Sequence, residues 1–168
     1  RHLLAPQAQS AIITSGTGSG KTERFMIPII EDLLRQHQQQ GRLVGVQALF
    51  LYPLNALINS QKERLDAWLS PLEGGIRYCL YNGNTREKPR QEPPPILMTN
   101  ATMLEYMLVR QADAPIVQKS KENQSLRWIV LDEAHSYIGS QAAEIALLLR
   151  RVVQAFGKQS HEIRFIAT

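Results

Sequence analysis

Apolar and polar positions follow one another along this chain in two distinct patterns. Short runs that are apolar at nearly every position, such as Leu43 to Tyr52, are typical of strands covered on both faces. Longer segments with an apolar stripe at helical spacing, such as Ala142 to Val153, are typical of helices packed on a core. The patterns predict strands at 11–14, 45–52, 76–81, 95–99, 127–131 and 162–167, and helices at 21–40, 56–69, 101–110 and 140–156.

Strands that alternate with helices in this way predict a parallel sheet wrapped by helices. The expected fold class is therefore α/β, a doubly wound parallel sheet. Two segments interrupt the alternation. Arg86 to Pro95 combines charged residues with four prolines and predicts an exposed loop. Ala112 to Ser125 is polar and irregular and predicts an insertion or a surface loop.

A segment rich in Gly, Ser and Thr joins the first strand to the first helix and ends in Gly20-Lys21-Thr22. A strand, a loop of this kind and a helix are the context of a phosphate-binding loop. Its glycines let several backbone N–H groups point at one anion, and the helix adds its positive N-terminal end. We expect Lys21 to contact the β- and γ-phosphates of a bound nucleotide and the Thr22 hydroxyl to bind Mg²⁺. The predicted nucleotide-binding residues are Ser15, which stands where the strict pattern has Gly, and Gly16, Thr17, Gly18, Ser19, Gly20, Lys21 and Thr22.

An acidic motif, Asp132-Glu133-Ala134-His135, follows the strand at 127–131. Ligands of open parallel sheets bind at the carboxyl ends of the strands, which is where this motif falls. We expect Asp132 to hold Mg²⁺, directly or through water, and Glu133 to orient and deprotonate the attacking water. A surface Asp-Glu pair that caps a helix is the alternative, and the phosphate loop upstream argues against it.

The bulk composition is that of one domain with a sizeable core, since 43% of the 168 residues are hydrophobic. A net charge of +4 permits a polyanionic partner without requiring one. The single cysteine, Cys79, excludes an internal disulfide and suits a reducing compartment such as the cytoplasm; its apolar surroundings predict burial. No apolar stretch approaches the ~20 residues of a membrane span, so no membrane partner is expected.

The two motifs and their spacing resemble superfamily 2 helicases of the DEAD/DEAH-box type. Residues 53–57 (PLNAL) look like motif Ia, residues 99–104 (TNATML) look like motif Ib, and residues 81–85 (YNGNT) sit where the family has a glycine-containing loop. Each segment alone could equally be a turn, a cap or a helix start. In the family all three line the track of the nucleic-acid backbone, which amides and hydroxyls can hold without reading bases. The resemblance implies nucleic-acid contacts from Pro53, Leu54, Asn55, Gly83, Thr99, Asn100 and Thr102.

The resemblance covers residues 1–168 and implies the first RecA-like, ATP-binding domain of a helicase or translocase. Its partners would be single-stranded nucleic acid, with DNA favoured over RNA, and a second RecA-like domain that supplies a catalytic arginine. Lys21, Asp132 and Glu133 would be catalytic, and His135 would link the ATP site to motif III, which is expected near Ala167-Thr168 in a longer parent protein. Gln7 and Gln9 are candidates for the adenine-reading glutamine.

Residues 103–108 (MLEYML) and 134–141 (AHSYIGSQ) further resemble large bacterial and fungal DEAH helicases of DNA repair and phage defence, often with a C-terminal zinc-binding region. Two alternatives stay open from the residues themselves. One is a kinase or GTPase built on the same phosphate loop, against which the Asp-Glu-Ala-His motif argues. The other is a non-catalytic nucleotide- or nucleic-acid-binding module, against which the joint presence of Lys21, Thr22, Asp132 and Glu133 argues.

Overall fold

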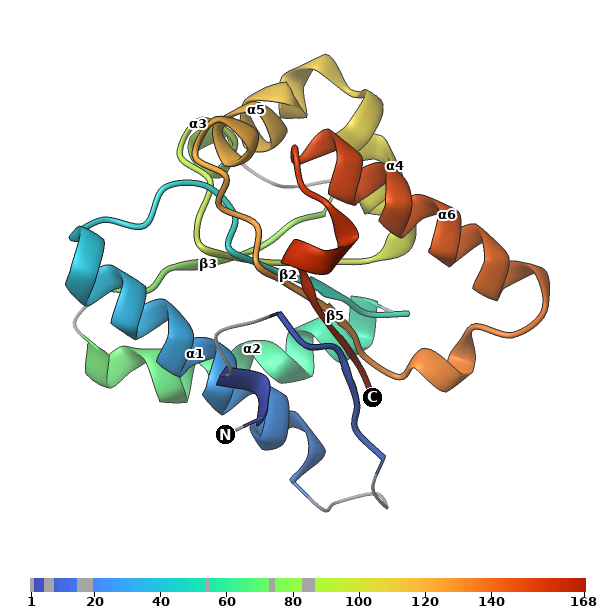
Figure 1. The fold of residues 1–168 in the computed structure, drawn as a ribbon, viewed down its shortest axis with the longest axis horizontal. Helices are drawn as coiled ribbons and strands as arrows, with labels where there is room; N and C mark the ends of the chain where they lie inside the picture. Colours follow the sequence, from blue (N-terminus) through green and yellow to red (C-terminus); the bar gives the residue numbers. More distant parts are fainter. Residues whose placement is uncertain (1, 5–7, 15–19, 54, 73–74, 83–86) are drawn as a thin grey trace.

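The structure, a computed structural model, describes residues 2–4, 8–14, 20–53, 55–72, 75–82 and 87–168 (Figure 1). In this part of the chain the strands form one sheet in the order β1-β6-β5-β2-β4-β3, and every neighbouring pair is parallel. This confirms the predicted α/β class. The strands are β1 (Ala11–Ile12), β2 (Ala48–Leu51), β3 (Tyr78–Leu80), β4 (Ile96–Thr99), β5 (Trp128–Leu131) and β6 (Arg164–Ala167).

Helices cover both faces of this sheet. Helices α1 and α2 lie on one face, and α4, α5 and α6 lie on the other (Figure 1). The helices are α1 (Lys21–Gln40), α2 (Asn55–Leu69), α3 (Glu87–Gln91), α4 (Ala101–Val109), α5 (Ala114–Glu122) and α6 (Ser140–Ala155), and the short 3₁₀ turns are η1 (His2–Leu4), η2 (Ser70–Leu72), η3 (Gln111–Asp113), η4 (Ala134–Ser136) and η5 (Ser160–Glu162). No helix among the described residues has the length and apolar character needed to cross a bilayer.

The alternation of side chains along each strand divides the core into two clusters. Phe50 and Tyr52 point to the α1 side and pack with Phe25, whereas Leu49 and Leu51 belong to the cluster under α4, α5 and α6. Both faces of β2 are therefore buried, which explains why its sequence is apolar at every position.

The prediction of an exposed loop at 86–95 is wrong for the part that the structure describes. Residues 87–91 form α3, and Pro93, Pro94 and Pro95 are buried. The Pro95 carbonyl accepts hydrogen bonds from the backbone N–H groups of Gln47 (2.8 Å) and Ala48 (2.9 Å) at the start of β2. Prolines suit this place because their extended backbone leads into β4 and their carbonyls still accept.

The prediction of a surface loop at 112–125 is also wrong, because most of this segment is the helix α5. Pro115 lies in its first turn, where a missing N–H costs nothing. Ser120 is fully buried, but its hydroxyl donates to the Ile116 carbonyl (2.6 Å) and accepts from the Val46 N–H (2.9 Å). The polar sequence thus conceals a packed helix whose buried hydroxyl is satisfied.

Cys79 is half-buried in β3, where burial had been predicted. Its partial removal from water raises the pKa of the thiol to about 11. The thiol is therefore protonated at neutral pH and behaves as a small packing residue.

A buried carboxylate ties the end of β3 to α3 and α5. Asp113 is 0% exposed and accepts from the Arg90 Nε at 2.6 Å and from the Tyr81 hydroxyl, and the Arg110 guanidinium lies 3.6 Å away. Burial and the Asp113 charge raise the pKa of Tyr81, so its hydroxyl stays protonated and donates.

We expect Asp113→Asn to lower the free energy of unfolding by about 3 kcal/mol, because a buried ion pair that loses one partner leaves an uncompensated charge. Urea unfolding followed by circular dichroism measures the loss. Asp66→Asn is the matched control, since Asp66 has similar partners, the Tyr78 hydroxyl and Lys62, at an exposed position. Equal effects of the two substitutions would contradict the role given to burial.

Candidate active site at the carboxyl ends of the strands

The carboxyl ends of β1, β6 and β5 are joined by backbone hydrogen bonds. The Ile13 N–H donates to the Ala167 carbonyl (2.8 Å), and the Thr168 N–H donates to the Leu131 carbonyl (3.1 Å). Because the strands are parallel, the segment that follows β1 and the acidic motif that follows β5 leave the sheet at the same edge. The fold thus brings the end of β1, which leads toward the predicted phosphate loop, and the acidic motif to one edge, with Thr168 between them.

The start of α1 is the described part of the predicted phosphate loop. Ser15, Gly16, Thr17, Gly18 and Ser19 lie outside the described residues, as does the side chain of Lys21. Gly20 has φ 72° and ψ 30°, a left-handed conformation that glycine adopts without strain, and its carbonyl accepts from the Arg24 N–H at 3.3 Å. Thr22 is buried in the first turn of α1, where the helix N-terminus favours anions.

Asp132 is held in place by its neighbours on β6 and in its own turn. It is 6% exposed, and its Oδ1 accepts from the Thr168 hydroxyl and from the Glu133 N–H (3.2 Å). Both bonds fall on one carboxylate oxygen, and within the described residues Oδ2 has no hydrogen-bond partner. The carboxylate is therefore oriented with one oxygen left for another ligand.

Thr168 is a site residue that the sequence analysis placed only by its position near motif III. Its Oγ1 lies 3.2 Å from the Glu133 N–H as well as beside Asp132, and its carbonyl accepts from the Ala134 N–H at 2.8 Å. The signal that could have found it is a hydroxyl directly after a strand, but its use depends on β6 lying next to β5.

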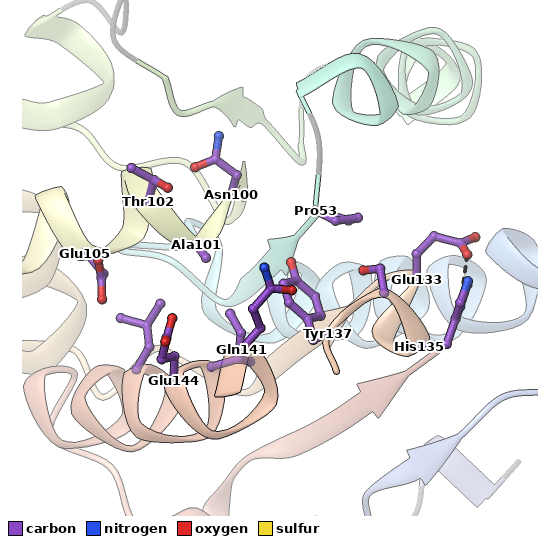
Figure 2. Close-up of a pocket in the computed structure, with 13 residues that line it drawn as sticks. Pro53, Asn100, Ala101, Thr102, Glu105, Glu133, His135, Tyr137, Gln141 and Glu144 are labelled. Atoms are coloured by element: carbon purple, nitrogen blue, oxygen red, sulfur yellow. Dashed lines mark ion pairs between the residues drawn. The ribbon is translucent and has the colours of Figure 1, made fainter. Parts of the chain in front are cut away.

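Glu133 turns the chain sharply after β5. Its φ of 52° and ψ of 44° are left-handed, which is uncommon for a residue with a side chain and marks strain at functional turns. The turn separates the two acids, so Asp132 is buried while the Glu133 side chain is 37% exposed. Its Oε2 lies 3.3 Å from the His135 Nδ1 (Figure 2), and the His135 side chain is mostly exposed. A carboxylate reached by solvent beside a buried one can accept a proton from water.

The residues present fit a magnesium ion that is shared with a nucleotide. Mg²⁺ is usually held by one or two carboxylates together with phosphates and water, in contrast to an all-protein cage. The described residues contain no cluster of three or more His, Cys, Asp or Glu that could form such a cage. Asp132 offers one oriented carboxylate and Thr22 one hydroxyl, and a buried hydroxyl without a partner, that of Tyr52, lies on the same side of the sheet.

Three of the predicted nucleic-acid residues line a cavity next to the acidic motif. The cavity, of about 830 Å³, has Pro53, Asn100 and Thr102 on one wall, facing Glu133 and His135 on the other (Figure 2). The Asn100 Oδ1 accepts from the Met103 N–H at 2.8 Å and so caps α4. Of the other predicted positions, Leu54 and Gly83 lie outside the described residues, as does the side chain of Asn55.

Thr99 lies in the core beneath this wall. It is fully buried, and its hydroxyl donates to the Tyr81 carbonyl at 3.0 Å. The bond holds the ends of β3 and β4 together, which positions Asn100 and Thr102 at the surface. Within this structure Thr99 therefore supports the surface that its neighbours form.

Two glutamines before β1 are the candidates for the adenine-reading residue, and one of them, Gln7, lies outside the described residues. Gln9 is half-buried just before β1, and its Oε1 is buried with no hydrogen-bond partner. An amide oxygen in this condition is available to the amino group of a base, and the role of Gln9 stays a prediction.

Comparison with known proteins gives a consistent result. A family model described as DEAD/DEAH box helicase matches residues 2–168. The Druantia protein DruE from Escherichia coli (strain UMEA 4076-1) is 24% identical over 277 aligned residues, which cover 99% of this chain and 15% of that protein. The ATP-dependent helicase hrq1 from Schizosaccharomyces pombe is 30% identical over 164 residues, which cover 93% of this chain and 14% of that protein.

Solved structures resemble the whole fold. The DUF1998 helicase MrfA, in a crystal structure with DNA and AMPPNP, superimposes with a TM-score of 0.72 at 26% identity over 95% of this chain and 21% of that one. The 168 residues thus span between 14% and 21% of the proteins compared.

Proposed function

The chain belongs to the DEAD/DEAH box helicase family, and from that premise we propose that it is the ATP-binding domain of a motor that hydrolyses Mg²⁺-ATP to move along single-stranded DNA. The observation that carries the proposal is the pair of acids after β5, one buried and oriented by Thr168, the other turned toward solvent. The structure of the helicase MrfA contains DNA and AMPPNP, and this supports DNA and ATP as the ligands that we propose.

Each site residue then has a distinct task. Lys21 neutralises the β- and γ-phosphates, and Thr22 and Asp132 hold Mg²⁺, which when bound draws negative charge from the phosphates in the transition state. Glu133 accepts the proton of the attacking water, and the contact of its Oε2 with the His135 Nδ1 at 3.3 Å sets the direction of the carboxylate. The Thr168 hydroxyl holds the Asp132 carboxylate and the Glu133 backbone beside the end of β6 through two hydrogen bonds.

We propose that a second RecA-like domain of the parent protein completes the site with an arginine. Such a residue contributes about 10³–10⁵ in rate in related phosphoryl transfers. The exposed His135 is placed to carry the state of the nucleotide to that domain. The zinc-binding region of the subgroup and a cytoplasmic location stay predictions about the parent.

The binding of nucleotide tests the proposal most directly. Calorimetric titration of Mg²⁺-ATP into the 168-residue chain should give saturable binding at one site, with a large loss of affinity in EDTA. Absence of binding would favour the non-catalytic nucleic-acid-binding module.

The nucleic-acid track is proposed to run over the N-terminal end of α4. Backbone N–H groups and the Thr102 hydroxyl at this end suit phosphates. The interior of the cavity does not, because Glu105, Glu133 and Glu144 line it and would repel a polyanion. In this proposal the nucleic-acid strand therefore crosses the wall of the cavity that Pro53, Asn100 and Thr102 form.

Binding of single-stranded DNA should be weak, insensitive to base sequence and salt-dependent. If two or three phosphates are contacted, the logarithm of the association constant should fall against the logarithm of salt concentration with a slope of about −2. Fluorescence anisotropy of labelled homopolymeric oligonucleotides over a salt series measures both properties. Tight, sequence-specific binding that ignores salt would contradict the motor assignment.

A further inference from the structure

Tyr52 occupies the position beside Asp132 at the carboxyl edge of the sheet. Its N–H donates to the Thr99 carbonyl (3.0 Å), while the Asp132 N–H donates to the Leu51 carbonyl (3.0 Å). Phe50 pairs with Val130 in the ladder, so side chains two residues further on, those of Tyr52 and Asp132, fall on the same face. That face is covered by α1, the helix whose first turn carries Thr22.

The Tyr52 hydroxyl is buried without a partner. The residue is 0% exposed in a core cluster that includes Phe25 and Met26 of α1, and its hydroxyl oxygen forms no hydrogen bond. An unpaired buried hydroxyl costs free energy, and native interiors rarely keep one. By contrast, the buried Tyr81 hydroxyl donates a hydrogen bond to Asp113.

Packing alone does not require the hydroxyl. Phenylalanine occupies the neighbouring core positions, Phe25 and Phe50, whose rings lie 6.1 Å apart. A phenylalanine at position 52 would fill nearly the same volume and would avoid the cost of desolvating the oxygen. A buried polar group that lowers the stability of the fold is typical of a functional site.

The Tyr52 side chain is a neutral phenol at pH 7, because a phenol loses its proton only at about pH 10. A neutral phenol both donates and accepts a hydrogen bond. It can therefore bridge a carboxylate and a water molecule, which a cation or an anion could not do in the same place.

We propose that the Tyr52 hydroxyl is a positioning group of the Mg²⁺-ATP site, which pairs with a water molecule of the hydrated metal beside Asp132. This rests on the proposed function, since it assumes that Asp132 holds the metal. The bound metal–nucleotide complex would give the Tyr52 hydroxyl a hydrogen-bond partner. The free energy that the unpaired hydroxyl costs in the domain without ligand would then contribute to the affinity for that complex.

Tyr52→Phe separates this role from a structural one. We expect the dissociation constant of Mg²⁺-ATP to rise about fivefold, as for one lost hydrogen bond, while the affinity for ATP in EDTA is unchanged. The unfolding temperature should stay the same or rise, because the variant removes an unsatisfied buried group. Calorimetry and thermal unfolding of the 168-residue chain give these quantities.

Tyr137→Phe is the matched control. The Tyr137 hydroxyl is also buried and unpaired, but it belongs to the cavity on the α6 side of the sheet (Figure 2). This variant should bind Mg²⁺-ATP as the parental chain does. Equal affinity of Tyr52→Phe and the parent, or a lower unfolding temperature than that of Tyr137→Phe, would overturn the inference. Failure of the parental chain to bind Mg²⁺-ATP would instead overturn the proposed function.

Discussion

Replacement of Glu133 by Gln in the parent protein is expected to leave Mg²⁺-ATP binding within about twofold of the parental value and to slow hydrolysis by about 10²–10⁴-fold. The amide keeps the volume of the side chain but cannot accept the proton of the attacking water. The left-handed backbone at position 133 is equally open to glutamine, so the turn after β5 and the contacts of Asp132 should persist. Steady-state turnover and equilibrium nucleotide binding measure the two effects separately.

Glu105→Gln provides the control for this variant. Glu105 lines the same cavity but stands on α4, away from Glu133 and His135 (Figure 2). It loses the same charge and should hydrolyse ATP at the parental rate. Parental turnover by Glu133→Gln would remove Glu133 from the role of base, and a large loss of ATP affinity would assign it to binding.

Strong local patterns made most of the sheet predictable from the sequence. The helix predicted at 21–40 is observed with those bounds, since its start follows a glycine and its apolar stripe is continuous. The strands at 127–131 and 45–52 were located to within a few residues because a central parallel strand must be apolar on both faces. These features are local, and each is decided by a few neighbouring residues.

The errors occurred where burial depends on distant partners. Asp113 and Ser120 make residues 112–125 look like a surface segment, yet both are buried. Asp113 is paired with Arg90, and Ser120 with the backbone of Val46, 74 positions earlier in the chain. Sequence patterns report the polarity of a side chain but do not report the partner that satisfies it.

The same distinction applies to the site. The acids Asp132 and Glu133 were recognised because they are adjacent and follow a strand. Thr168 joins them only because the chain places β6 between β1 and β5, an order that no local pattern specifies. The unpaired hydroxyl of Tyr52 was likewise indistinguishable from a core phenol until its surroundings were known.

Lys21→Ala should weaken the binding of Mg²⁺-ATP by at least about 100-fold, the loss expected when charge-assisted phosphate contacts disappear. The variant isolates the ammonium group. Gly20 and the N-terminal end of α1 remain, and alanine is the best helix former, so the fold and the helix dipole should be preserved. Calorimetric titration in excess Mg²⁺ measures the affinity, and thermal unfolding checks the fold.

Arg24→Ala is the control that makes this result specific. Arg24 is an exposed cation in the same turn of α1, and its backbone N–H, which bonds the Gly20 carbonyl, is unaffected by the substitution. A general attraction between the basic start of α1 and a nucleotide would be reduced equally in both variants, whereas a phosphate contact depends on Lys21 alone. Unchanged affinity in Lys21→Ala would exclude a phosphate-binding loop at residues 15–22, and the motor assignment would fall with it, since the acids after β5 would have no triphosphate to act on.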